Sequence, residues 1–194
     1  DFILLARLVE KITGQKLNDY VENNFYEPMG LRNIGYRPLN SISYDKIVPS
    51  TKEVGFRNQE LRGYVHDQGA SILGSVSGHA GLFSNAEDIA VIMQTLLNNG
   101  EWKGKKYFNK ETVKLFTSYQ SKKSRRGLGF DKPERDNATR IDPYPSLSAS
   151  PETFGHTGFT GTCAWADPKN NLIFIFLSNR IYPEDNGVFK SLNI

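Results

Sequence analysis

The sequence predicts an α+β fold in which a helical region packs on an antiparallel sheet. Apolar residues recur at helical spacing over much of residues 1–120, whereas the segments typical of β-strands lie in residues 121–194. The chain has 194 residues and a hydrophobic share of 38%, which is enough to bury the core of one ordinary domain. We therefore expect helices first and strands last.

The first two helices are expected near the start of the sequence. Residues 1–13 place leucine and isoleucine on one face of a helix that Gly14 closes, since a left-handed residue costs least at glycine. A second short helix covers residues 18–26. It stops before Pro28 because the residue ahead of a proline avoids helical angles. Residues 37–69 have poor periodicity and several prolines and glycines, so we predict an irregular stretch without strands.

Two further helices are expected before the strands. Residues 84–87, Ser-Asn-Ala-Glu, form a capping box in front of an apolar stripe over residues 89–97. Asn109 can cap a shorter helix. The four prolines of residues 133–151 then predict a loop.

The strands are expected in the last third of the chain. Residues 160–166 and 172–177 flank the turn-rich segment 167–171, which fits an antiparallel hairpin. Residues 128–130 are a candidate third strand.

Charge and cysteine content exclude several kinds of partner and scaffold. The 24 Lys and Arg against 21 Asp and Glu give a net charge of +3, too small to predict a nucleic-acid or membrane surface. The basic run at residues 122–126 is predicted to be a solvated loop. One cysteine cannot form an internal disulfide, and no segment approaches the length of a membrane span. His66 and His79 lack a third ligand at metal spacing, so we expect no metal site and no cofactor.

Three stretches of the sequence carry a resemblance to a known family. They are residues 2–31, residues 65–67 with the turn Gly78-His79-Ala80-Gly81-Leu82-Phe83-Ser84, and residues 154–180 with His156-Thr157-Gly158. Together they resemble the serine β-lactamase-related family, which includes class C β-lactamases, D-alanyl-D-alanine peptidases and related esterases. The resemblance implies a β-lactamase/transpeptidase-like fold that is incomplete here, because the N-terminal strands of the family are absent. It implies a single truncated domain over residues 1–194, mainly helix and loop to residue 120 and sheet strands beyond it.

The third stretch is the most specific, and the resemblance implies a role for each of its residues. His156 would face the acidic group of the substrate or help to polarise the family's tyrosine, and Thr157 would hydrogen-bond the substrate. Gly158 would let the substrate lie close to the strand, and the backbone N–H of Phe159 would be one of two oxyanion donors. The same wall of the cleft would include the substrate-binding residues Gly78, His79 and Gly81.

The family's nucleophile and second proton-transfer group come from a Ser-x-x-Lys motif and a tyrosine motif. The resemblance places both motifs upstream of Asp1. The parent would thus be a serine hydrolase that acts on an amide, β-lactam or ester, on a small-molecule or peptidoglycan-like substrate, in the bacterial periplasm or cell envelope. This chain would be inactive alone. Truncation would expose apolar surface and a strand edge, so we expect self-association or pairing with an N-terminal fragment.

Two alternatives stay open. A Ser-x-x-Lys at Ser43 and a Tyr-x-Asn at Tyr107 precede His156 in the order of the family, but Pro49 breaks the helix that the nucleophile should open. The other alternative is a non-catalytic binding or assembly module that retains the cleft wall. A serine hydrolase and a non-catalytic module differ in whether any chain places a Ser-x-x-Lys motif beside His156.

Overall fold

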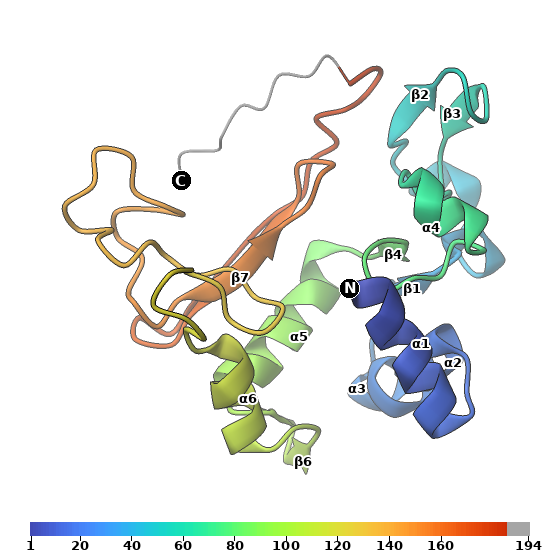
Figure 1. The fold of residues 1–194 in the computed structure, drawn as a ribbon. Coiled ribbons are helices and arrows are strands. Elements are labelled where there is room, and N and C mark those ends of the chain that lie inside the picture. The colour runs from blue at the N-terminus through green and yellow to red at the C-terminus, as the bar shows by residue number, and fades with distance from the viewer. Residues whose placement is uncertain (186–194) are drawn as a thin grey trace. The chain divides into compact units, whose positions relative to one another are not determined.

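The computed structural model describes residues 1–185, and these form two compact units that we describe separately (Figure 1). Residues 1–88 and 178–185 make up the first unit, and residues 89–177 make up the second. The single truncated domain inferred from the sequence stays a prediction. No helix of the described residues has the length and apolar character needed to cross a membrane.

The first unit is built from short helices and two small antiparallel strand pairs, β1 with β4 and β2 with β3. Its elements are α1 (Phe2–Thr13), α2 (Leu17–Val21), a π-helix (Glu22–Tyr26), α3 (Glu27–Met29), β1 (Gly35–Tyr36), 3-10 helices at Pro38–Asn40 and Tyr44–Lys46, β2 (Thr51–Glu53), β3 (Gln59–Leu61), α4 (Gln68–Ile72) and β4 (Leu82–Phe83).

The second unit contains the main sheet, in the order β7-β8-β9, and the pair β5 with β6. The helix α5 begins at the end of the first unit and continues into the second. The elements are α5 (Ala86–Leu97), β5 (Glu101–Trp102), β6 (Lys105–Lys106), α6 (Lys110–Thr117), β7 (Phe154–Thr157), β8 (Cys163–Asp167) and β9 (Leu172–Phe176). Helices and small antiparallel sheets make this an α+β fold, as predicted.

The predicted first helix is confirmed, but the prediction that the second helix stops before Pro28 is wrong. The helical path continues from α2 through the π-helix into α3, and Glu27 has helical angles of φ −60° and ψ −49°. Pro28 stands directly after the π-helix, as the second residue of α3, so the path passes through it without a break. Gly30, at φ 81°, ends the path.

The prediction that residues 37–69 contain no strands is also wrong, because β2 and β3 form a hairpin there. Arg57 holds this hairpin through polar contacts. The strands therefore do not need the alternation of apolar and polar residues by which a sequence reveals a strand. Its Nε donates to the Glu53 carboxylate at 2.6 Å, and its Nη1 and Nη2 donate to the carbonyl oxygens of Val65 and His66 at 2.7 and 2.9 Å. Hydropathy patterns do not detect a strand pair of this kind.

The predicted helix after Ser84 is confirmed as α5, but its cap is Asn85 and not Ser84. The Asn85 Oδ1 accepts the Asp88 N–H at 2.9 Å, whereas the Ser84 hydroxyl donates to the Asn85 carbonyl at 3.2 Å. Asn109 precedes α6 as predicted, although its side chain makes no capping hydrogen bond. Each helix therefore begins where expected, and only the cap of α5 is a different residue from the predicted one.

The predicted hairpin is confirmed as β8 and β9, which pair antiparallel from Asp167↔Leu172 to Cys163↔Phe176. β8 begins later than predicted because residues 158–162 form a turn, in which the Gly158 N–H donates to the Thr162 carbonyl at 2.7 Å. The candidate strand at residues 128–130 is wrong. The neighbouring Asp131 instead forms an isolated bridge to Gly155 of β7.

One face of the main sheet packs on α5 within the second unit. Met93 of α5, Phe154 of β7 and Ala166 of β8 are buried together, and the Phe130 ring meets the Phe154 ring edge-on at 5.2 Å. The rest of this core is partly buried and consists of Ile89, Leu96, Leu97, Ala164 and Ile173. The helix thereby supports the strand that carries the His-Thr-Gly residues.

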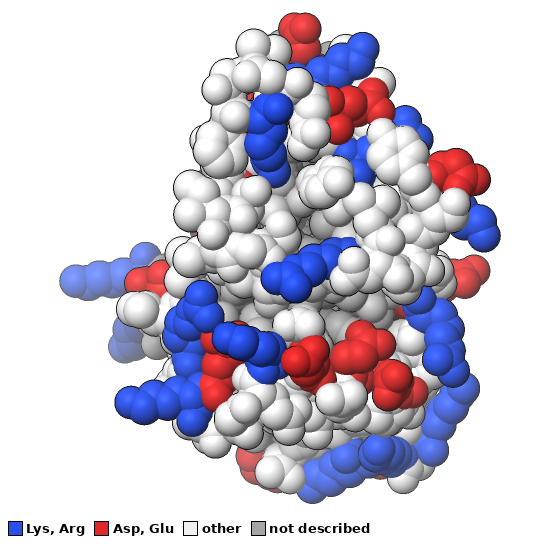
Figure 2. Space-filling view, turned by 90° about the vertical axis from the view of Figure 1, so that its right-hand side faces the viewer, with Lys and Arg blue, Asp and Glu red and all other residues white. Residues whose placement is uncertain are grey.

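Charged side chains of both signs are interspersed over the face in Figure 2. The presence of both signs agrees with the small net charge of +3.

Candidate functional site

The end of β7 brings two of the predicted site residues to the surface. Phe154 and Gly155 are buried, whereas His156 and Thr157 are exposed. On one edge, β8 pairs with the whole strand, with His156 opposite Ala164. On the other edge the bridge from Asp131 reaches Gly155 only, and no further residue of the described chain pairs there. The outer edge of β7 is therefore open in the sense that no strand of the described chain pairs with it at His156 and Thr157.

Both ring nitrogens of His156 have a partner. Nδ1 lies 2.7 Å from the carbonyl oxygen of Thr157, and Nε2 lies 3.0 Å from Nη1 of Arg126. The Arg126 side chain is half exposed, at 50%. A guanidinium thus stands directly beside the histidine.

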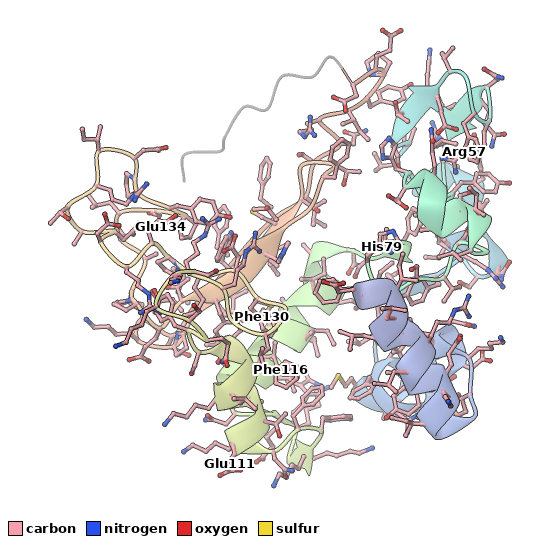
Figure 3. All side chains as sticks on the ribbon, in the orientation of Figure 1. Arg57, His79, Glu111, Phe116, Phe130 and Glu134 are labelled. Atoms are coloured by element: carbon pink, nitrogen blue, oxygen red, sulfur yellow. The ribbon has the colours of Figure 1, made fainter. Side chains whose placement is uncertain are left out.

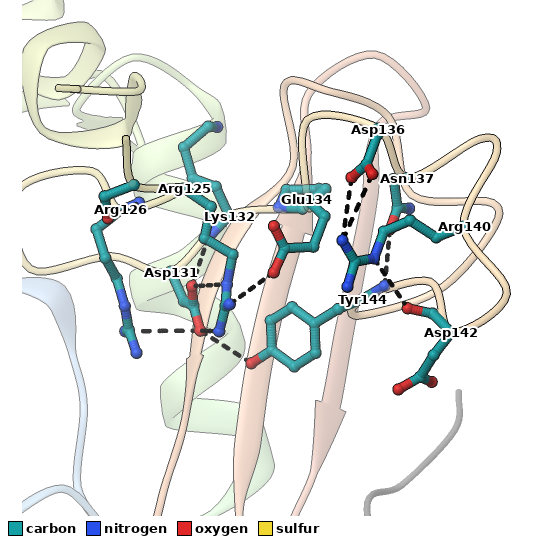
Figure 4. Close-up of polar contacts among 12 residues, drawn as sticks. Arg125, Arg126, Asp131, Lys132, Glu134, Asp136, Asn137, Arg140, Asp142 and Tyr144 are labelled. Atoms are coloured by element: carbon teal, nitrogen blue, oxygen red, sulfur yellow. Dashed lines mark hydrogen bonds and ion pairs between the residues drawn. The ribbon is translucent and has the colours of Figure 1, made fainter. Parts of the chain in front are cut away.

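A buried carboxylate, Asp131, organises the residues behind β7 (Figure 4). It accepts the Arg125 Nε at 2.7 Å and the Tyr144 hydroxyl at 2.9 Å. Burial acts to raise the pKa of Asp131, but the hydrogen bonds from Arg125 and Tyr144 outweigh it and hold that pKa below its ordinary value. Arg125 also bonds Glu134 at 2.8 Å, and its guanidinium lies over the Tyr144 ring. Asp131 is therefore a fixed negative charge.

The prediction that the basic run at residues 122–126 is a solvated loop is confirmed for the exposed Lys122, Lys123 and Arg126, whereas Arg125 is partly buried. Lys122 and Lys123 are exposed, whereas Arg125 is anchored on Asp131 and Arg126 contacts His156. Sequence spacing does not show these contacts, because Arg126 and His156 are 30 positions apart.

Gly158 lies in the turn after β7, and the structure gives a packing reason for glycine there. A Cβ atom at this position would overlap the Thr162 hydroxyl. Gly155 has a similar requirement, since a Cβ would overlap the Ala164 carbonyl and the Trp165 ring. The next residue, Phe159, is exposed. The predicted contacts of Gly158 and Phe159 with substrate stay predictions.

The other predicted site residues belong to the first unit, where His79 is labelled in Figure 3. His79 bridges two neighbours, with Nε2 2.9 Å from Asp67 Oδ1 and Nδ1 2.9 Å from the Ser77 hydroxyl. Asp67 also caps α4 by accepting the Ala70 N–H at 2.7 Å. His79 thus stabilises the turn locally.

The glycines of this turn allow close backbone packing. A Cβ at Gly78 would overlap the Phe2 carbonyl oxygen, and one at Gly81, where φ is 109°, would overlap the Ser75 carbonyl oxygen. A substrate-binding role for Gly78, His79 and Gly81 stays a prediction.

The alternative nucleophile, Ser43, lies in an unsuitable local structure. It precedes the one-turn 3-10 helix Tyr44–Lys46, and its hydroxyl bonds the Asp45 carboxylate. Ile47 is already extended, so Ser43 does not open a helix as the family's nucleophile does. Tyr107 lies between β6 and α6, and its N–H donates to the Gly100 carbonyl at 2.8 Å.

Nothing within residues 1–185 groups three or more His, Cys, Asp or Glu side chains as a metal site would require. The single cysteine, Cys163, is buried in β8, and this burial raises its thiol pKa. Neither observation provides a metal ligand set or an activated thiol.

Comparison with known proteins gives the family. A family model described as Beta-lactamase matches residues 1–194. The chain belongs to the β-lactamase family. A protein of Escherichia coli (strain K12) named as a candidate D-alanyl-D-alanine carboxypeptidase is 42% identical, over 93% of this chain and 44% of its own length. A Salmonella enteritidis protein with the same name is 37% identical with the same coverage. The chain thus spans less than half the length of these relatives.

Solved structures of the family share the fold. A β-lactamase from Mycobacterium bovis matches with a TM-score of 0.60 and 20% identity, over 92% of this chain and 54% of that one. A penicillin-binding protein homologue from Caulobacter crescentus also gives 0.60, with 18% identity over 90% and 49% of the two chains. The resemblance and the β-lactamase/transpeptidase-like fold inferred from the sequence are both confirmed.

Proposed function

We propose that this β-lactamase-family chain supplies one wall of the cleft of a serine hydrolase, which cleaves an amide, β-lactam or ester through an acyl-enzyme. The open outer edge of β7 at His156 and Thr157 carries the proposal, because a substrate can approach the His-Thr-Gly stretch there. The name of the E. coli relative favours a peptide that ends in D-alanine, as a peptidoglycan-like substrate does. Such a substrate would place the protein in the bacterial periplasm or cell envelope.

The substrate would lie along the outer edge of β7 and extend the sheet by one strand. In this arrangement the Thr157 hydroxyl hydrogen-bonds the substrate at the exposed end of the strand. The backbone N–H of Phe159 donates to the oxyanion that forms when the nucleophile attacks the carbonyl carbon. A preorganised donor of this kind is worth about 3–4 kcal/mol of the barrier.

The nucleophile and its base would come from outside these 194 residues. The surroundings of Ser43 support this view, since its hydroxyl is bonded to Asp45 and only a single 3-10 turn follows it. This chain matches 44% of the length of the E. coli relative, so more than half of that protein lies outside the match and can carry the Ser-x-x-Lys motif. The chain alone would therefore hold the wall of the cleft without the acylated serine.

A chimera tests this proposal. The matching part of the E. coli relative is replaced by this chain, and D-alanine release from an acyl-D-alanyl-D-alanine peptide is measured beside the intact relative. We expect the chimera to release D-alanine and Thr157→Val to lower kcat/KM by about 10-fold, the value of one net hydrogen bond. Thr139→Val, on the exposed loop, is the matched control. A folded chimera without activity, beside an active relative, contradicts the proposal and favours a non-catalytic module.

A further inference from the structure

The partners of His156 fix where its proton lies. The Arg126 guanidinium has N–H groups and no acceptor, so at 3.0 Å it donates and the Nε2 of His156 accepts with its lone pair. The Thr157 carbonyl only accepts, so at 2.7 Å the Nδ1 of His156 donates and carries the proton. Together the two contacts select the neutral imidazole with its proton on Nδ1.

Arg126 is held in place from two directions. Its carbonyl accepts the Gln120 N–H at 3.2 Å, which fixes the backbone. Its guanidinium lies 3.5 Å from Asp131 Oδ2, the contact drawn in Figure 4. Asp131 in turn exchanges two backbone hydrogen bonds, at 2.7 and 3.0 Å, with Gly155, the residue before His156. Asp131 thus holds the arginine through its carboxylate and the strand that carries His156 through its backbone.

We propose that Arg126 is a positioning residue that holds the neutral His156 imidazole in the Nδ1–H tautomer and itself presents the positive charge at the open edge of β7. The tautomer itself does not depend on the proposed function, but its role in substrate binding rests on that function. His156 offers no N–H outward in this state, because one nitrogen donates to Thr157 and the other accepts from Arg126. An anionic substrate group at this edge therefore meets the half-exposed guanidinium and not an imidazolium.

Nitrogen NMR of the 194-residue chain tests the assignment without any turnover. Long-range proton–nitrogen spectra at about pH 8, above the ordinary range of histidine, distinguish protonated from unprotonated ring nitrogens. The chain has three histidines, and the His156→Gln variant identifies the relevant signals. We expect a protonated Nδ1 and an unprotonated Nε2 at His156.

Variants at Arg126 separate its effect from that of the Thr157 carbonyl. Arg126→Met should shift His156 toward the Nε2–H tautomer that free histidine favours, and Arg126→Lys should restore the original pattern in part, since an ammonium also only donates. Arg140→Met is the matched control, because Arg140 is paired with Asp136 at 3.2 Å.

A wild-type chain with its proton on Nε2 overturns the assignment, and this result stands even if Arg126→Met does not fold. An Arg126→Met chain with intact β7 and β8 amide signals and an unchanged tautomer overturns it as well. An inactive chimera with the expected tautomer would instead contradict the proposed function alone.

Discussion

At the scale of single residues, buried carboxylates shape the second unit. Asp167, at the end of β8, accepts the Ser150 hydroxyl at 2.6 Å, the Ser150 N–H at 3.0 Å and the Asn170 amide at 2.8 Å. Burial acts to raise the pKa of Asp167, but these hydrogen bonds prevail and lower it from 3.8 to about 2. Asp167 therefore stabilises the folded chain in its ionised form.

The lowered pKa of Asp167 predicts a pH dependence of stability. Since the folded pKa lies below the unfolded one, the contribution is complete above pH 3.8 and is lost as the pH falls toward 2. We expect Asp167→Asn to lower the free energy of unfolding by about 1–3 kcal/mol near neutral pH, because the donors around it lose their charged acceptor. The variant should also lose less stability than the wild type as the pH falls into the acid range. Urea unfolding between neutral and acid pH measures both effects, with the exposed Asp142→Asn as control. An unchanged loss of stability in the acid range would contradict the account.

Some residues around the candidate site are predictable from the sequence, and others are not. His156, Thr157 and Gly158 follow one another, so a sequence pattern finds them. Arg126 and Asp131 reach β7 through the fold; Arg126 belongs to a basic run that resembles many solvated loops, and the sequence analysis did not single out Asp131. Contacts between residues 30 positions apart have no local signature.

At the scale of elements, α1 carries an apolar face that is open in the described chain. Leu4, Leu8 and Ile12 recur every fourth residue and are 71%, 50% and 74% exposed. An exposed apolar stripe of this kind marks an interaction surface. It supports the predicted self-association, or pairing with an N-terminal fragment.

Sedimentation velocity of the chain tests the role of this stripe. We expect the wild type to sediment as a dimer or larger species at micromolar concentration and the double variant Leu8→Glu/Ile12→Glu to shift toward the monomer. Val54→Glu is the matched control, since Val54 is 85% exposed in the β2–β3 connection. A monomeric wild type, or a double variant that associates as the wild type does, would contradict a role for α1.

The elements also show which signals the sequence carries. The stripe of α5 and the β8–β9 hairpin were predictable because their apolar residues are buried against each other at regular spacing. The continuation through Pro28 and the Arg57-bound hairpin were not, because a π-helical turn and side-chain hydrogen bonds to the backbone decide them. Tertiary polar contacts override local propensity at these positions.

At the scale of the whole molecule, the family and the α+β fold follow from the sequence, whereas the catalytic competence of the chain depends on what lies beside the β7 edge. The structure presents His156 and Thr157 on that edge, and it places Ser43 just before a one-turn helix with its hydroxyl bonded to Asp45. We therefore propose that the chain provides the wall of an acyl-transfer cleft and not its nucleophile.

Intact-mass spectrometry after incubation with a labelled penicillin tests this claim most directly. The 194-residue chain alone and the chimera with the E. coli relative are incubated side by side. The account predicts no adduct on the chain alone and a stoichiometric adduct on the chimera, at a serine in the part that the relative contributes. A stoichiometric adduct on the chain alone, mapped to Ser43, would contradict it and make Ser43, Lys46, Tyr107 and His156 a working site.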